Sequence, residues 1–296
     1  EKGVTTVTWT VTDDSGNTGA CSFTVTVKDY TLPVVTCVNT QERVALPGTC
    51  LYTTIGNEFD PSGTTDNCGV ESVVYNLFGV TTGTGYNTLD GLNFNVGQTV
   101  VVWIASDASN NTNTCTFNVV VEDKEPPALT CPADILQPAD TGTCATVVTY
   151  AATADDLCSG TIVDIFPASG SSFSVGTHSV QVTATDDYGN ASVCNFNVTV
   201  VDTEPPVVSC PPNITTNTLP NLCWSIVEFE AAATDNCGSV TTSATPASGS
   251  VFSAGVTTVT VTATDGSNNT GTCSFAVIVN DTQTPTAVCQ PVPVQL

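Results

Sequence analysis

Cysteines and carboxylates are the side chains whose number and spacing in this sequence could do chemistry. The 296 residues include 14 cysteines and 28 acidic residues, against four basic residues and one histidine. Cysteines form disulfides or bind soft metal ions, whereas carboxylates bind hard cations or act as acids and bases. The spacing of these residues therefore decides which of these chemistries the chain supports.

The cysteines recur periodically. One follows a polar turn at positions 21, 115, 194 and 273, and another lies at a constant offset from it, at positions 37, 131, 210 and 289. The last two intervals are equal and the first is longer. Such a period indicates an array of similar units. We predict part of a preceding repeat at 1–32, an enlarged repeat at 33–125, repeats at 126–204 and 205–284, and the start of another at 285–296. The sequence contains no methionine, and we expect it to be a window from a longer array.

Apolar and polar residues alternate on both sides of each polar turn. In the first copy Trp9 and Val11 alternate with threonines, and Phe23 and Val25 continue the pattern after the turn. A period of two predicts half-buried strands, and Asp, Asn and Gly between them predict a hairpin turn. The other three copies align with the first in register, and in the second copy Trp103 and Ala105 take the positions of Trp9 and Val11.

Each hairpin leads into an acidic joint that contains proline, at residues 29–33, 123–127, 202–206 and 281–285. Proline fixes its own backbone and restricts the residue before it, so joints this short are expected to be stiff. About seven short strands in roughly 80 residues are typical of immunoglobulin-like domains. We predict an all-β fold of tandem immunoglobulin-like β-sandwich domains arranged as an extended rod.

The first complete repeat is longer than the other two, since Cys21 and Cys115 are further apart in the sequence than the equivalent cysteines that follow. Residues 78–95, rich in Gly and Thr, are expected to form an extra loop or hairpin. An extended loop is a candidate binding surface, and a tolerated surface insertion is the alternative.

Zinc binding is the rival to disulfide formation. The chain has a single histidine, His178, and no C-x-x-C pair, so the usual zinc-site spacings are absent. Disulfides are the better prediction, and they imply export to an oxidising compartment, outside the cell or on its surface.

The direction of the strands suggests which cysteines meet. If the first strand runs away from the incoming joint and the second returns, the first two cysteines flank the turn between these strands, and the third and fourth lie together at the incoming end. The second and third cysteines of a repeat are separated by a strand of about a dozen residues at ~3.3 Å each, far beyond the ~6 Å reach of a disulfide. We predict that the first cysteine pairs with the second and the third with the fourth. The predicted pairs are Cys37–Cys50, Cys68–Cys115, Cys131–Cys144, Cys158–Cys194, Cys210–Cys223 and Cys237–Cys273. With these pairs, Cys21 and Cys289 have partners outside the sequence. The alternative joins the first cysteine of a repeat to the fourth.

The same reasoning brings carboxylates together where one repeat meets the next, because the joint, the end of the second strand and the hairpin turn share one end of the repeat. Calcium takes six to eight oxygen ligands and would relieve the repulsion within such clusters. Calcium between the domains is therefore predicted, with turn chemistry of Asp and Asn as the alternative. The candidate ligands are Asp29, Asp66 and Asp107; Asp123, Glu125, Asp155, Asp156, Asp186 and Asp187; and Asp202, Glu204, Asp235 and Asp265.

Charge and composition exclude several functions. The net charge of −24 repels the phosphates of nucleic acids and anionic lipids, and no apolar run is long enough to insert into a membrane. Catalysis is not expected either, since His178 occurs in one repeat alone and the carboxylates recur at turns in every unit. There is no Gly-rich phosphate loop and no H-E-x-x-H pattern.

The sequence resembles the hyalin-repeat (HYR) family. The shared patterns are P-P-V-x-x-C-P, T-D-N-C-G and T-D-x-x-G-N-x-x-x-C-x-F-x-V-x-V, and together they cover essentially the whole chain. Departures are Leu32 in place of Pro, Asp156-Leu157 in place of Asp-Asn, and the enlarged first repeat. The resemblance implies extracellular, immunoglobulin-like domains associated with adhesion. The last residues, 285–296, resemble a repeat opening in large surface adhesins of gliding bacteria, which are carried along the cell surface.

We therefore expect a structural and adhesive spacer from a long extracellular repeat protein, a cell-surface adhesin or filament. Its partners would be neighbouring repeats of the same chain, with surface polysaccharide or another cell-surface protein as further candidates. Two alternatives stay open: a ligand- or carbohydrate-binding module, and accessory repeats of a secreted enzyme.

Overall fold

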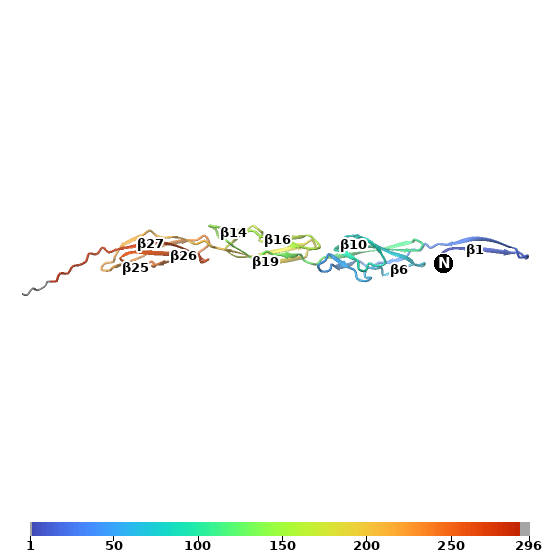
Figure 1. Ribbon diagram of the computed structural model, residues 1–296, viewed down its shortest axis with the longest axis horizontal. Helices are drawn as coiled ribbons and strands as arrows, with labels where there is room; N and C mark the ends of the chain where they lie inside the picture. The colour runs from blue at the N-terminus through green and yellow to red at the C-terminus, as the bar shows by residue number, and fades with distance from the viewer. Residues whose placement is uncertain (1, 291–296) are drawn as a thin grey trace, which may run out of the picture. The chain divides into compact units, whose positions relative to one another are not determined.

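The computed structural model describes residues 2–290, and within that range the chain forms strands, turns and loops without a helix (Figure 1). The predicted start of a following repeat, 285–296, lies partly outside the described residues. By contact, the chain divides into two compact units, one made of Glu1–Leu129, Ala154–Val163 and Thr183–Ser192, the other of Thr130–Thr153, Asp164–Val182 and Val193–Leu296.

The strands recur in the same order in each repeat. An isolated hairpin, called here the terminal hairpin, consists of β1 (Gly3–Thr12) and β2 (Thr18–Val27). The first repeat contains β3 (Val34–Thr36), β4 (Gln41–Val44), β5 (Leu51–Thr53), β6 (Gly63–Thr65), β7 (Val70–Gly79), β8 (Gly83–Tyr86), β9 (Asn93–Asn95), β10 (Gly97–Asp107) and β11 (Thr112–Glu122).

The two later repeats each have eight strands and lack a counterpart of β8. The middle repeat contains β12 (Ala128–Thr130), β13 (Ile135–Pro138), β14 (Ala145–Val148), β15 (Thr153–Asp155), β16 (Thr161–Phe166), β17 (Ser171–Ser174), β18 (Gly176–Asp186) and β19 (Ala191–Val201). The third repeat contains β20 (Val207–Ser209), β21 (Ile214–Asn217), β22 (Trp224–Val227), β23 (Ala232–Thr234), β24 (Thr241–Thr245), β25 (Ser250–Ser253), β26 (Gly255–Thr264) and β27 (Thr270–Asn280).

One larger sheet and two small ones make up each repeat. The larger sheet has the order β4-β11-β10-β7-β8 in the first repeat and β21-β27-β26-β24 in the third. The small sheets pair β3 with β6 and β5 with β9, or their counterparts. The short strand β4 lies parallel to β11, with Gln41 opposite Val119 and Val44 opposite Glu122. The prediction of tandem all-β sandwich domains is confirmed.

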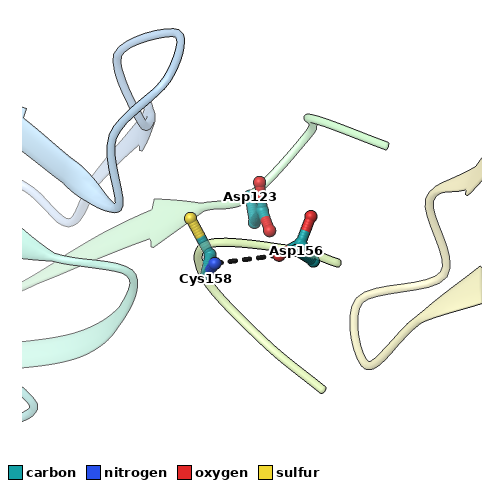
Figure 2. A group of neighbouring side chains, drawn as sticks. All are labelled: Asp123, Asp156 and Cys158. Carbon is teal, nitrogen blue, oxygen red and sulfur yellow. Dashed lines mark hydrogen bonds between the residues drawn. The ribbon is translucent and has the colours of Figure 1, made fainter. Parts of the chain in front are cut away.

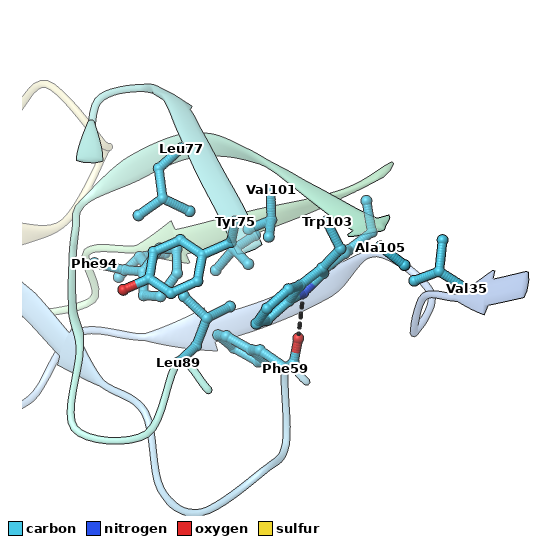
Figure 3. Packing of buried hydrophobic residues seen from close by; sticks show 12 residues of the cluster. Val35, Phe59, Tyr75, Leu77, Leu89, Phe94, Val101, Trp103 and Ala105 are labelled. Carbon is cyan, nitrogen blue, oxygen red and sulfur yellow. Dashed lines mark hydrogen bonds between the residues drawn. The ribbon is translucent and has the colours of Figure 1, made fainter. Parts of the chain in front are cut away.

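The core lies between the sheets of each repeat. In the first repeat Val101, Trp103 and Ala105 of β10 are fully buried, as their alignment in register with the other hairpins predicts, and they pack with Phe59 and Phe94 (Figure 3). The indole Nε1 of Trp103 donates to the carbonyl oxygen of Phe59 at 3.1 Å, which satisfies the one polar atom of this side chain.

The enlarged segment of the first repeat is not a free loop. Strand β8 extends the larger sheet by pairing with β7, and β9 pairs with β5. Leu89 and Phe94, both within the segment, are 1% and 0% exposed. Burying a large apolar side chain is worth about 1.5–3 kcal/mol, so this segment contributes to the core.

The terminal hairpin pairs in the same register as β10 and β11 but lacks the rest of a sandwich. Trp9 lies opposite Cys21, as Trp103 lies opposite Cys115. Trp9 and Phe23 are 65% and 51% exposed, whereas their counterparts Trp103 and Phe117 are 0% and 5% exposed. The apolar face of the hairpin therefore has the composition of a core face. Among residues 2–290 nothing packs against it as a second sheet does in the complete repeats.

Candidate functional site

The joints gather the cysteines and carboxylates that the sequence singles out. We call residues 29–33, 123–127, 202–206 and 281–285 the first to fourth joints. The second joint and the residues that contact it lie within one compact unit, and the third joint lies with its contacts within the other. Each joint can therefore be described from contacts inside a single unit.

The hairpin turn of each repeat is tied to the joint that precedes it. In the middle repeat the Asp186 carboxylate accepts from the backbone N–H groups of Tyr188 and Asn190 at 2.9 and 2.7 Å. The Asn190 Nδ2 group donates both to Asp186 Oδ2 at 2.7 Å and to the carbonyl oxygen of Asp123 at 3.3 Å. Asn111 and Asn269 make the same pair of contacts at the first and third joints. The turn therefore faces the preceding repeat, as predicted.

These hydrogen bonds control the ionisation of the turn aspartates. Burial raises the pKa of Asp186, but the hydrogen bonds from the Asn190 side chain and backbone outweigh it and hold that pKa below the ordinary value of 3.8. The pKa values of Asp107 and Asp265 are lowered by the corresponding asparagines, again against the effect of burial. The turn carboxylates are thus anions engaged with their own turns.

Two carboxylates from consecutive repeats meet at the second joint. Asp123 follows β11 and is 3% exposed, and Asp156 comes from the turn that leads to Cys158. Ligand atoms of these three residues lie within 4.8 Å of one another (Figure 2). Asp123 Oδ1 accepts from the N–H of Glu125, but its Oδ2 is buried and has no hydrogen-bond partner.

Similar clusters occur at the first and third joints. Asp202 and Asp235 lie together with Cys237 at the third joint, and Asp29, Asp66 and Asp107 lie together at the first. Buried Oδ2 atoms of Asp29, Asp66 and Asp235 have no hydrogen-bond partner. The Asp29 carboxylate beside Cys68 raises the pKa of that thiol. An unpaired buried carboxylate oxygen beside other carboxylates is costly unless a cation is shared between them.

Other predicted metal ligands have different contacts. Glu125 Oε2 accepts from the N–H of Gly48 and Glu204 Oε2 from the N–H of Gly142, both at 2.8 Å. Asp187 accepts from the N–H of Gly160 at 3.0 Å. Asp155 lies at the end of β15, beside Asp156. The two glutamates therefore hold the joint against the loop that carries the second cysteine, a role that the sequence did not indicate.

The predicted pairing of the cysteines is wrong. The first cysteine of each repeat pairs with the fourth, as the alternative proposed, with Cα–Cα distances of 5.6, 6.3 and 5.9 Å. The second cysteine pairs with the third cysteine of the next repeat. The disulfides are Cys37–Cys115, Cys131–Cys194 and Cys210–Cys273 within repeats, and Cys50–Cys158 and Cys144–Cys237 between repeats.

The cause of the error is the path of β4. The prediction placed the first two cysteines on either side of a turn at one end of the repeat. Instead β4 runs beside β11, in the same direction, towards the joint that leaves the repeat. Cys50 therefore reaches the outgoing joint, where Cys158 of the next repeat lies. In the structure Cys21, Cys68, Cys223 and Cys289 are exposed and have no disulfide partner among residues 2–290.

Comparison with known proteins places this repeated unit in a family. The model of the HYR domain matches residues 1–27, 28–121, 122–200 and 201–279. The chain belongs to the HYR-domain family. Its HYR repeats are 36% identical over 302 residues to hyalin of Lytechinus variegatus, an alignment that covers 95% of this chain. The chain spans about half the length of that relative (54%).

A shorter match involves a bacterial surface protein. The serine-rich adhesin for platelets of Staphylococcus aureus strain MRSA252 is 33% identical over 122 residues, which cover 40% of this chain and 8% of the adhesin. Among solved structures, mouse cadherin-23 EC22-24 aligns with a TM-score of 0.35 and 17% identity, over 82% of this chain and 96% of that chain. Within residues 2–290 there is no helix long and apolar enough to cross a membrane.

Proposed function

We propose that this chain is an extracellular spacer and adhesive segment in which consecutive HYR repeats are coupled at their joints. The observation that carries the proposal is the covalent bridge between repeats, Cys50–Cys158 and Cys144–Cys237. A bridge beside the backbone joint restrains one repeat against the next, as a spacer that transmits force requires. Disulfides of this kind suit an oxidising, extracellular setting.

The relatives support an adhesive setting. One relative is a hyalin and another is named as an adhesin for platelets. The contacts of the titratable groups support a non-catalytic role, because the turn aspartates hold their own turns and Glu125 holds Gly48. The single histidine, His178, bonds the carbonyl oxygen of Ser174 within one repeat. Surface polysaccharide or another cell-surface protein as the contacted ligand, and carriage along a gliding cell, stay predictions.

Small-angle X-ray scattering of the oxidised chain tests the spacer role. A compact single domain of this length has a radius of gyration of about 19 Å by the usual scaling with residue number. The radius of gyration of the spacer is expected to be well above that value and to stay the same from low to physiological salt. A radius close to that of a compact single domain would contradict the proposal.

We further propose that calcium binds at the joints and stiffens them. The donors fit a hard cation: Asp123 and Asp156 supply oxygen, and the buried Oδ2 of Asp123 has no other partner. The sulfur of Cys158 belongs to the bridge with Cys50, so it is not a thiolate ligand. A soft metal is therefore disfavoured. Calcium would link a carboxylate of one repeat to a carboxylate of the next.

Calorimetry with calcium and with EDTA tests this proposal. Calcium at 100 times its dissociation constant adds about 2.7 kcal/mol to the free energy of unfolding, so the melting temperature should rise. The variant Asp123→Asn should reduce this rise, and the exposed strand residue Asp164, changed to Asn, is the matched control. No change in melting temperature at several millimolar calcium would contradict the proposal.

A further inference from the structure

Cys68 and Cys223 occupy the two cysteine positions from which the inter-repeat bridges are made. The second cysteine of the first and middle repeats pairs with the third cysteine of the repeat that follows. Cys223 is the second cysteine of the third repeat, and Cys68 is the third cysteine of the first repeat. Both are exposed and have no partner in the part of the chain that the structure describes.

The surroundings of Cys223 already have the geometry of a bridged joint. The N–H of Asn221 donates to Gln283 Oε1 at 3.1 Å, as those of Gly48 and Gly142 donate to Glu125 and Glu204. Asn221 has φ of 64°, close to the 69° of Gly48 and the 75° of Gly142. Asn tolerates this left-handed conformation better than most residues. The loop of Cys223 is therefore held against the fourth joint as its counterparts are held against the second and third.

Gln283 also reproduces the backbone contact of the joint glutamates and adds a hydrogen bond of its own. Its backbone N–H donates to Asp281 Oδ1 at 3.0 Å, as Glu125 donates to Asp123 and Glu204 to Asp202. Its Nε2 donates to the carbonyl oxygen of Leu219 at 2.9 Å. An uncharged amide replaces the carboxylate and still holds the same loop.

The surroundings of Cys68 form the other half of a bridged joint. The N–H of Cys68 donates to Asp66 Oδ1 at 2.8 Å, as those of Cys158 and Cys237 donate to Asp156 and Asp235. At the third joint the neighbouring Asn236 donates from Nδ2 to the carbonyl oxygen of Thr143, in the loop that carries Cys144. Asn67 stands at the position of Asn236 in the sequence, next to Cys68.

We propose that Cys68 and Cys223 are the two halves of one recurring interface and that each forms a disulfide with a further HYR repeat. The partner of Cys223 is the third cysteine of a repeat that follows, within an Asp-Asn-Cys-Gly turn. The partner of Cys68 is the second cysteine of a repeat that precedes, in a loop held like that of Cys144. The inter-repeat bridges then form a continuous series, with one bridge at every joint.

Each bridge is a two-electron oxidation of two thiols. A small disulfide such as oxidised glutathione supplies the oxidising equivalents: one cysteine thiolate attacks it and releases one thiol, forming a mixed disulfide. The second cysteine thiolate attacks the mixed disulfide and releases the other thiol. The two cysteine protons end on the two released thiols.

Extension of the chain at its C-terminal end tests the Cys223 bridge. Residues 206–284 are repeated after Thr284, so that a copy of Cys237 follows the fourth joint. After oxidation with glutathione and mapping without reduction, we expect a disulfide between Cys223 and the copy of Cys237. Labelling of Cys223 by N-ethylmaleimide should fall at least tenfold relative to the original chain. In the matched control the copy of Cys237 is changed to Ser, and N-ethylmaleimide should then label Cys223 as fully as in the original chain.

The bridge equivalent to Cys210–Cys273 in the added repeat reports whether that repeat has folded. If it has not, the extension is made with residues 127–204, whose third cysteine is Cys158. Full labelling of Cys223 in an extended chain with a folded added repeat would overturn the proposal, and so would a Cys223 disulfide to any other cysteine.

Extension at the N-terminal end tests Cys68 in the same way. Residues 126–173 placed before residue 1 complete the terminal hairpin, because Cys194 and Cys21 are equivalent in the repeat. We expect the copy of Cys144 to pair with Cys68 and the copy of Cys131 to pair with Cys21. Trp9, now 65% exposed, should be buried like Trp103, with a blue shift of its fluorescence. Burial of Trp9 with Cys68 still labelled would overturn the proposal. The inference deepens the proposed spacer function, but its readout is a mapped disulfide, so either proposal can fail without the other.

Discussion

Removal of the bridge between the first and middle repeats is expected to destabilise both. The variant carries Cys50→Ser and Cys158→Ser. With Cys37–Cys115 intact, the bridge closes a loop. The loop runs from Cys50 back to Cys37, across that disulfide to Cys115, and along the chain from 115 to 158. In the chain-entropy model a loop of this size, some tens of residues, contributes about 4 kcal/mol to the free energy of unfolding.

The assay is guanidinium unfolding without reductant, followed by the fluorescence of Trp103, which is buried in the first repeat. For a slope of several kcal/mol per molar, the midpoint should fall by roughly 1 M. The matched control replaces Cys68 and Cys223, which have no partner within residues 2–290, with Ser. A double variant that unfolds at the midpoint of the control would refute the reasoning, because the bridge would then restrain nothing.

Three further predictions concern the turns and the core. The pKa of Asp186 lies below 3.8, so the stability from this carboxylate is present above that pH and is lost as the pH falls through the lowered pKa. Asn190→Ala should therefore move acid unfolding, followed by circular dichroism, to higher pH, and an unchanged midpoint would count against it. Phe94→Ala should cost about 3–5 kcal/mol in chemical denaturation, whereas the half-exposed Phe78→Ala should cost far less; a cost at Phe94 as small as that at Phe78 would contradict the burial of Phe94 in the core. Gly142→Ala places a Cβ at φ of 75° and should cost about 1 kcal/mol or more in thermal unfolding, and a neutral effect would contradict the left-handed backbone at this position.

The hairpins and their direction could be predicted from the sequence because their signals are local. The register of the hairpin repeats places Trp103 at a buried position, and Asp186 with Asn190 forms a turn that needs no distant partner. The predicted strand directions place that turn at the incoming end of the repeat, which brings it next to Asp123 of the preceding joint. The hydrogen bond from Asn190 Nδ2 to the carbonyl oxygen of Asp123 confirms this neighbourhood.

The cysteine pairing and the role of the joint glutamates depend on contacts that no local pattern encodes. Strand β4 has four residues, too few to show from alternation that it runs parallel to β11 and carries Cys50 to the outgoing joint. Glu125 binds Gly48, which is distant in the sequence. Phe94 lies in a segment rich in Gly and Thr, and the signal that marks it as a core residue is its alignment with Phe173 and Phe252 of the other repeats, not local alternation.

Peptide mapping of the oxidised, unreduced chain tests most directly whether the repeats are covalently coupled. The structure predicts linked peptides that contain Cys50 with Cys158 and Cys144 with Cys237, together with four free thiols, at Cys21, Cys68, Cys223 and Cys289. Linked peptides that contain Cys37 with Cys50 and Cys158 with Cys194 would contradict it.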